Sequence, residues 1–486
     1  MSDDKTAFND YLEKVRHDSE KIFNLFSRAR IYKVPEGLRK LNESAYIPRI
    51  IAIGPLHRNE KHLQTPMRGI KRHYINCLFD RLTKDSVTKS SLLEQCLNKM
   101  KEKKFVGEVK EFYAKEFTVN DDDLLNKTNE KEFVDKAKKY YDKEVMMTQP
   151  VTGGDPILDI ILTRNFVKLD LLLLENQIPF FVLEELFKLT VAKIPENKLS
   201  LTDYVHEYFG EIMSPEGKNS GSNTKTGCSP SDCALWVNRI EQVSGKAKEY
   251  YHILHFLHDS YLPGKNRRIN QNSTGVPLTS PLRCPLLLPR CTPPKEKTTG
   301  RQFGELQLSA LDLDYAGVKF AVAPDRENNQ FNINFNEPQS IFSWLFCGAK
   351  FEIPTLHIHD PTESFFRNLI ALEQCCPGVE PYFTSYAKLM DMLISSKEDV
   401  KVLKGKKVIR NHLGTDKDVA DLFNKLCKEV VLEEFYFKDQ CQDAYKYSQH
   451  CWPWFWAQCK RSDVRRVPRH VTDEILITWW PLPQAV

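Results

Sequence analysis

The 486-residue sequence lacks the short motifs that mark several well-known catalytic sites. It contains no G-x-x-x-x-G-K-[ST], no G-x-G-x-x-G, no G-x-S-x-G and no H-E-x-x-H. These absences remove the usual sequence support for phosphate-cradling, dinucleotide-binding, serine-hydrolase and zinc-protease sites. An enzyme with this sequence would need a site of an unrecognised kind.

Disulfide and membrane signals are also missing. The 13 cysteines include no C-x-x-C pair, so neither a zinc ribbon nor a thioredoxin-like motif is indicated. The first residues carry acids and no apolar segment of a signal peptide, so we expect a reducing, cytoplasmic compartment and mostly free thiols. No stretch approaches the ~18 apolar residues of a membrane-spanning helix, so we expect a soluble or peripherally membrane-associated protein.

Net charge gives little support for a nucleic-acid partner. The chain has 69 basic and 65 acidic residues, a formal net charge of +4, which is too balanced to indicate a nucleic-acid binder. Its 41% hydrophobic and 28% charged residues are ordinary for a globular chain with a large core. We therefore expect a folded protein without nucleic acid as a partner.

Polar residues interrupt the most apolar part of the chain, LDLLLLENQIPFFVLEELF at residues 169–187. Pro179 lacks a backbone donor and disfavours helical backbone at the residue before it. We therefore expect one helix to run through residues 171–174 and stop near Asn176, and a second to start near Pro179. The pattern predicts a buried helix–corner–helix.

The residues of this corner have two interpretations. Glu175, Asn176, Gln177 and Pro179 are predicted to form a structural hub, in which the polar side chains satisfy backbone groups freed at the break. Alternatively, Glu175 acts as a catalytic acid together with His57 and Asp170. The structural interpretation is favoured because a buried acid in a packed corner is usually paired rather than reactive.

Two groups of histidines are candidate metal ligands. His252, His255 and His258 follow at three-residue steps in a predicted helix at 236–261, where the outer two lie about 9 Å apart along the axis. His357 and His359 alternate in a predicted strand, which places both on its exposed face. We expect neither group to bind a metal, and we expect no cofactor.

The fold class expected is mainly α with a small antiparallel or mixed sheet in the C-terminal half. Period-two segments cluster at about residues 315–360, so we expect the sheet to be confined to that stretch, whereas helical spacing of apolar residues occupies most of the rest. Polar, turn-rich stretches separate the parts. The expected segments are an amphipathic helix at 1–26, a helical half containing the corner at 27–212, a linker at 213–232, a helix at 233–262, a Pro/Ser/Lys-rich linker at 263–300, a sheet with helices at 301–440, and a Trp/Arg-rich tail at 441–486.

Several separated motifs resemble those of a plant family known as domain of unknown function 247. The resemblance covers roughly residues 27–440 and is carried by LLLLENQIPFFVLE, by the stretches 316–320 and 384–387, and by an N-terminal motif. The matching N-terminal residues are Ile31, Val34, Pro35, Leu38, Arg39, Tyr46, Pro48, Ile53, Gly54, Pro55 and His57.

The resemblance implies a function without naming a reaction. Some relatives are associated with self-incompatibility in grasses, which favours a non-enzymatic module that recognises a protein or peptide. The alternative is a hydrolase or nuclease with an unrecognised acid and histidine site. Relatives commonly end in a membrane-spanning helix, whereas the tail of this chain carries aromatic and basic residues. These residues either contact a lipid surface peripherally or form a packed aromatic terminus or an altered C-terminus. These residues are Trp452, Trp454, Phe455, Trp456, Lys460, Arg461, Arg465 and Arg466.

Overall fold

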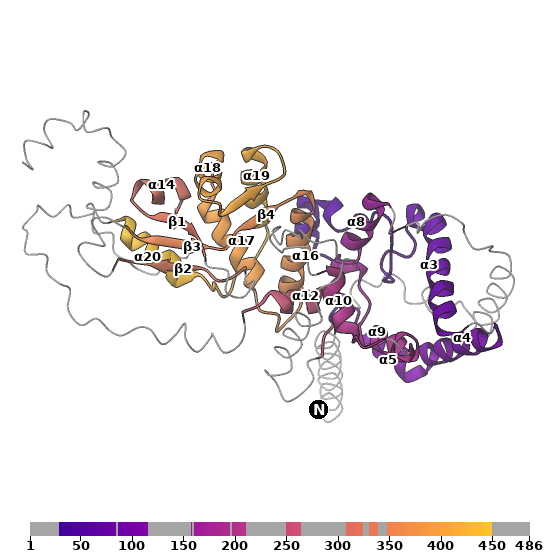
Figure 1. Cartoon of the computed structure of the whole chain (residues 1–486). Helices are drawn as coiled ribbons and strands as arrows, with labels where there is room; N and C mark the ends of the chain where they lie inside the picture. The colour runs from indigo at the N-terminus through magenta and orange to yellow at the C-terminus, as the bar shows by residue number, and fades with distance from the viewer. Residues whose placement is uncertain are drawn as a thin grey trace, which may run out of the picture. The chain divides into compact units, whose positions relative to one another are not determined.

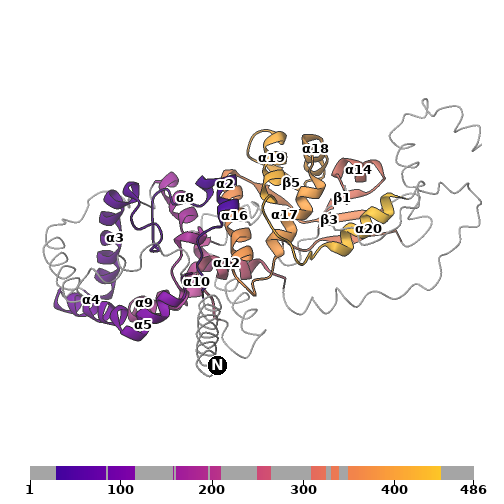
Figure 2. The same ribbon diagram turned by 180° about the vertical axis from the view of Figure 1, so that it is seen from behind.

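A computed structural model describes most of the chain (Figure 1 and Figure 2). The described residues are 29–83, 86–114, 157, 160–194, 197–209, 249–263, 308–323, 330–338 and 348–449. Several expectations fall on residues outside these ranges. They are the helix at 1–26, the linkers at 213–232 and 263–300, the first part of the helix at 236–261, and residues 450–486 of the tail at 441–486.

The chain divides into two compact units that interleave in sequence. The first takes its described residues from Met1–Ser260, Pro361–Phe383 and Lys428–Val431, and the second from Tyr261–Asp360, Thr384–Cys427 and Leu432–Val486. The segments expected from the sequence are consecutive, and their boundaries stay a prediction. Segments distant in sequence therefore contribute to each hydrophobic core.

The first unit is helical in its described residues. Its elements are α2 (Glu36–Leu41), η1 (Glu43–Ala45), α3 (Lys61–Leu82), α4 (Ser86–Lys101), α5 (Lys103–Glu111), α8 (Ile161–Asp170), η3 (Leu174–Asn176), α9 (Phe180–Leu189), η4 (Val191–Lys193), α10 (Leu201–Phe209), and most of α12 (Ile253–Tyr261) and α16 (Asp360–Cys375). Between α2 and α3 the chain follows the irregular path that its prolines predict. Aliphatic and aromatic side chains form the core of this unit, and Phe180 of α9 stacks on Phe256 of α12 with ring centroids 6.2 Å apart.

The second unit combines helices with two small sheets. Its strands are β1 (Lys319–Val322), β2 (Asn334–Asn336), β3 (Lys350–Ile353), β4 (Leu356–Ile358) and β5 (Ile409–Asn411). Its helices are α14 (Ala310–Tyr315), most of α17 (Tyr382–Leu393), α18 (Lys397–Gly405), α19 (Asp416–Leu426) and α20 (Lys438–Ser448). The expected class, mainly α with a small sheet in the C-terminal half, is confirmed.

Alternation of apolar residues explains the larger sheet, which has the order β1-β3-β2. β3 pairs with β1 in parallel and with β2 in antiparallel orientation, so the sheet is mixed. Phe320 and Phe351 are buried on neighbouring strands and stack at 5.8 Å between ring centroids. Tyr447 of α20 covers β2, since its ring lies 6.2 Å from that of Phe335 (Figure 1).

The second sheet corrects one expectation. β4 pairs in parallel with β5, which lies outside the stretch 315–360 to which the sheet was expected to be confined. The strand is only three residues long, and a single apolar residue, Ile409, enters the core. Such a short segment among lysines carries no period-two signal.

Candidate functional site

The corner begins earlier than its sequence predicts. α8 ends at Asp170, so the helix expected through residues 171–174 is not formed, and a single 3-10 turn, η3, follows at Leu174–Asn176. The side-chain amide of Gln177 donates to the carbonyls of Leu171 and Leu173 at 2.8 and 2.9 Å. These bonds satisfy carbonyls that a continuing helix would have used, which explains the early end. Pro179 then directly precedes α9, as expected.

Asp170 binds the backbone of the N-terminal segment. Its carboxylate accepts from the amides of Arg49, Ile50 and Ile51 at 2.8, 2.7 and 2.9 Å. The side chain is buried, and desolvation raises its pKa, although the three amide bonds act in the opposite direction. Asp170 thus anchors an irregular stretch more than 110 residues earlier in the chain.

Glu175 binds a different part of the same segment. Its Oε1 accepts from the amide of Val34 at 2.6 Å and from the guanidinium of Arg39, and its Oε2 lies 3.3 Å from Nε2 of His57. Burial disfavours the carboxylate, but the contacts with His57, Arg39 and Val34 outweigh burial and lower its pKa. Of the three catalytic candidates, Glu175 and His57 are therefore in contact, whereas Asp170 binds the backbone amides of residues 49–51.

Asn176 uses both ends of its side-chain amide. Its Oδ1 accepts from the amides of Ile53 and Gly54 at 2.7 and 3.2 Å, and its Nδ2 donates to the carbonyls of Ile51 and Asp170, each at 2.8 Å. The residue is completely buried. All four bonds go to backbone, so Asn176 closes the hydrogen bonding of a buried irregular segment.

Gln177 connects the corner to α12 and to the residues that follow α5. Its Oε1 accepts from the amide of Leu254 in α12 at 3.3 Å, and its backbone carbonyl accepts from the hydroxyl of Tyr113 at 3.0 Å. Next to it, the amide of Phe180 donates to the carbonyl of Tyr251 at 2.8 Å. The corner therefore contacts segments before α3, after α5 and at the start of α12.

These contacts decide what the corner can do chemically. Glu175, Asp170 and His57 are all buried, and both acids hold backbone amides. A substrate would have to break these bonds to reach either carboxylate. The catalytic interpretation thus requires a rearrangement, while the hub interpretation uses the bonds as they stand and remains a prediction that substitutions must test.

His252, just before α12, and His255 and His258 within it contact separate partners. His252 Nε2 lies 3.2 Å from the carbonyl of Arg30, and burial lowers the pKa of His252 to about 3, so that its ring is neutral. His255 Nδ1 accepts from the amide of Tyr251 at 3.1 Å, and His258 Nε2 lies 2.7 Å from Oε1 of Glu373. The spacing does not bring these rings to one point.

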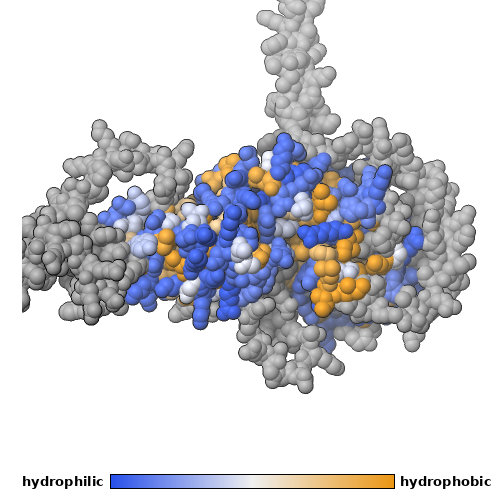
Figure 3. All heavy atoms as spheres, turned by 90° about the horizontal axis from the view of Figure 1, so that it is seen from above, coloured by the Kyte–Doolittle hydropathy of each residue, from blue (hydrophilic) through white to orange (hydrophobic). Residues whose placement is uncertain are grey.

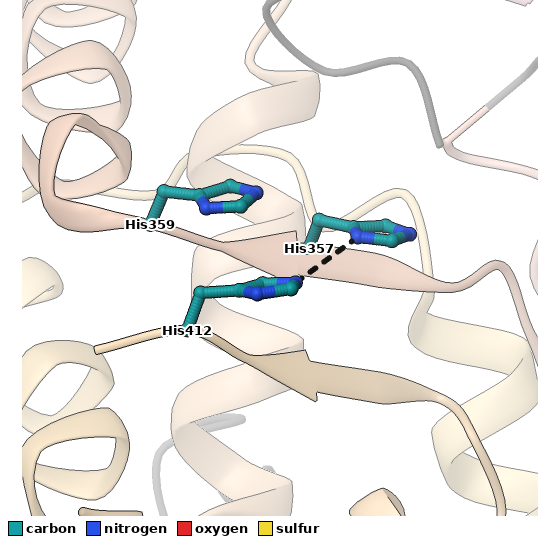
Figure 4. A group of neighbouring side chains, drawn as sticks. All are labelled: His357, His359 and His412. Carbon is teal, nitrogen blue, oxygen red and sulfur yellow. Dashed lines mark hydrogen bonds between the residues drawn. The ribbon is translucent and has the colours of Figure 1, made fainter. Parts of the chain in front are cut away.

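A different group of histidines does converge. His357, His359 and His412 each offer a ring nitrogen, and these atoms all lie within 4.8 Å of one another. Figure 4 shows the rings side by side, two from the β4 segment and one from the end of β5. Sequence reasoning found the shared face of His357 and His359 but missed His412, because no local pattern links residues 55 positions apart.

Most of the chain matches one protein family. The family described as "Plant protein of unknown function", domain of unknown function 247, matches residues 31–472. The chain belongs to this family. The resemblance that the ENQIPFF corner and the N-terminal motif carry is thereby confirmed.

Two Arabidopsis thaliana relatives extend the match. The chain is 24% identical to "UPF0481 protein At3g47200" over 459 residues, which are 93% of this chain and 84% of the relative. It is 29% identical to "Putative UPF0481 protein At3g02645" over 145 residues, 30% of this chain and 25% of that relative. No solved structure matches the chain. The family match therefore assigns no activity to any residue.

The described cysteines are thiols. Cys77, Cys96, Cys375, Cys376, Cys427 and Cys441 are all free. Burial raises the pKa of Cys427 and of Cys441 to about 12, so neither is a reactive thiolate at neutral pH. Within the described part of the chain, no helix combines the length and apolar character needed to cross a membrane.

Proposed function

We propose that this protein is a non-enzymatic module that binds an amphipathic, acidic segment of a protein or peptide at the start of α8. The observation that carries the proposal is a run of exposed apolar side chains. Ile160, Ile161 and Leu162 are 54, 67 and 62% exposed. Single exposed apolar residues are normal on a protein surface, but three in succession are costly in water unless a partner covers them.

The residues around Ile160, Ile161 and Leu162 indicate the chemistry of the partner. Figure 3 shows hydrophobic residues exposed among hydrophilic ones on one face of the molecule. Arg164 is exposed one turn after Ile161, and Lys168 follows one turn later, with its ammonium 5.4 Å from the ring centroid of Tyr208. The only acid of α8, Asp170, is buried at its far end. An apolar surface beside two cations fits a partner with apolar side chains and flanking carboxylates.

The contacts of Asp170 and Arg49 support a binding role for α8. Asp170 fixes the C-terminal end of the helix to the backbone of residues 49–51, and Arg49 lies over the ring of Phe166 at 5.0 Å from its centroid. A helix held in this way presents its exposed end on a rigid support. Rigid presentation reduces the conformational entropy lost on binding.

The hydrolase or nuclease alternative has weaker support. It requires a substrate to reach Glu175, His57 and Asp170, which are buried and hold parts of the N-terminal segment. The recognition role associated with self-incompatibility in some relatives would be one form of the proposed interaction. The partner itself must be found by experiment.

The proposal is tested by cross-linking followed by direct binding. A photoreactive residue at Leu162 of the full chain should capture a protein from plant extract that the same residue at Val431, a separate exposed site, does not capture. The purified partner should then bind the Ile160→Ser, Ile161→Ser, Leu162→Ser variant more than about ten-fold more weakly than wild type. Equal binding by this variant, with an unchanged melting temperature, would refute the proposal.

We further propose a cytoplasmic location with at most peripheral membrane contact through the Trp/Arg-rich tail, residues 441–486. A few aromatic and basic side chains give marginal, salt-sensitive membrane binding. Fractionation of the full chain beside a version ending at His450 should recover both mainly without membranes. Moderate salt should release any membrane-bound fraction of the full chain. A requirement for detergent would contradict the proposal.

A further inference from the structure

Backbone pairing places three histidines on one side of the smaller sheet. His357 and His359 are two residues apart and so share a face, while Leu356 and Ile358 point into the core. β4 pairs in parallel with β5, and the amide of His412 donates to the carbonyl of Ile358 at 2.9 Å. This bond continues the ladder by one residue and brings His412 beside His359.

One pair of ring nitrogens, which are in hydrogen-bond contact, has the separation found in a metal site. His412 Nε2 lies 3.4 Å from His357 Nδ1, and the ligand atoms of all three rings lie within 4.8 Å of one another. Two nitrogens bound tetrahedrally to one zinc ion at about 2.0–2.1 Å lie about 3.3 Å apart. The first pair therefore already has the required spacing.

Ring orientation is the part that must adjust. The rings of His359 and His412 are stacked, with centroids 4.1 Å apart and planes inclined by 13° (Figure 4). The planes of His357 and His412 are inclined by 11°. Lone pairs in parallel planes do not meet at one point, so metal binding needs rotation of the rings about their side-chain bonds. His412 is exposed and the other two are partly exposed, so the surface location allows this rotation.

The donor set selects the class of metal. Neutral imidazoles suit zinc, copper, nickel and cobalt, whereas magnesium and calcium prefer carboxylate and carbonyl oxygens. Arg410 pairs with His357 across the sheet and shares its face, which opposes any cation, but Arg410 is exposed and water screens its charge. Three histidines leave one coordination position for water.

We propose that His357, His359 and His412 bind one divalent late first-row transition metal ion, with zinc as the favoured ion. The metal would cross-link β4 to β5 and so stabilise a sheet whose strands contain only three residues each. The proposal is independent of the binding role of α8. It concerns side chains of the second unit alone.

The test is a titration of the metal-stripped full chain with Zn²⁺. Wild type is compared with the triple variant His357→Gln, His359→Gln, His412→Gln, and with His62→Gln, which removes an exposed histidine far along the chain. The triple variant should lose one equivalent of bound zinc, or bind it more than about ten-fold more weakly. The control variant should bind zinc as wild type does.

Titration with Co²⁺ distinguishes metal binding by these histidines from metal binding by cysteines. Co²⁺ bound to histidines gives visible ligand-field bands without the thiolate charge-transfer band that cysteine ligands produce. The Co²⁺ signal lost in the triple variant should be of this histidine type. If the triple variant fails to fold without metal, the single variant His412→Gln replaces it, because His412 is exposed.

The proposal fails if wild type and the folded variant bind Zn²⁺ with the same stoichiometry and affinity. It also fails if the lost Co²⁺ signal carries the thiolate band, or if wild type binds Zn²⁺ only at millimolar concentrations.

Discussion

Asn176→Leu tests the structural role of the hub by removing the hydrogen bonds of one buried side chain. Leucine has the same number and branching of side-chain heavy atoms as asparagine, with bulkier methyl groups and no hydrogen-bonding group, so the substitution removes four bonds and opens no cavity. The bonds are those to the amides of Ile53 and Gly54 and to the carbonyls of Ile51 and Asp170. All four backbone partners then lose the side chain that satisfies them.

The magnitude follows from the burial of those partners. The buried amide of Gly54 is left unsatisfied, at a cost of about 1–3 kcal/mol, and the buried carbonyl of Asp170 keeps only a long bond of 3.4 Å from the amide of Leu173. Ile51 and Ile53 are partly exposed, so water can replace part of their lost bonding. We expect the free energy of unfolding to fall by about 3–6 kcal/mol, a large share of the roughly 5–15 kcal/mol of a typical domain.

Denaturant and thermal unfolding provide the assay. The control is Asn165→Leu, which makes the same chemical change at an exposed position of α8. The control should change stability by no more than about 0.5 kcal/mol. The hub variant should lower the melting temperature by about 6 °C or more. Equal melting temperatures for the hub variant and wild type would refute the reasoning.

Two further predictions concern the same contacts. A Cβ at Gly54 would lie 2.7 Å from the backbone oxygen of Gln177, so Gly54→Ala should destabilise the protein by about 1–3 kcal/mol in the same unfolding assay; unchanged stability would show that the two segments are not in close contact. Glu175→Gln should lower stability by about 3 kcal/mol at pH 7, because it breaks a buried ion pair. Since the folded pKa of Glu175 is lowered, its carboxylate stabilises wild type above the ordinary pKa, and this stability is lost as the pH falls through the folded pKa. The difference between variant and wild type should therefore shrink in acid, and a difference independent of pH would contradict the assigned charge.

Sequence reasoning located the corner because its signals are local. Pro179 and the polar residues between two apolar blocks predict a break, and α9 begins directly after Pro179. The end of α8 was misplaced because the side chain of Gln177 competes for the carbonyls of Leu171 and Leu173. Local propensity carries no information about that competition.

The partners of the corner could not be read from one sequence. Glu175 binds Val34, 141 residues earlier, and Leu174 donates its amide to Asn368, 194 residues later. Neither pair has a local signature, because long-range pairing depends on how the whole chain packs. The same limit hid His412, which is brought to His357 by the pairing of β4 with β5.

Hydrogen exchange at single amides tests the hub most directly. The amides of Val34, Ile50, Ile51, Ile53 and Leu254 donate to side chains of the corner, and the first four lie in a segment outside regular helix and strand. If Asp170, Glu175, Asn176 and Gln177 organise the fold, these amides should exchange as slowly as those of the buried helix α16. Exchange at the rate of exposed loops would show that the corner does not hold the segment, and would contradict the account.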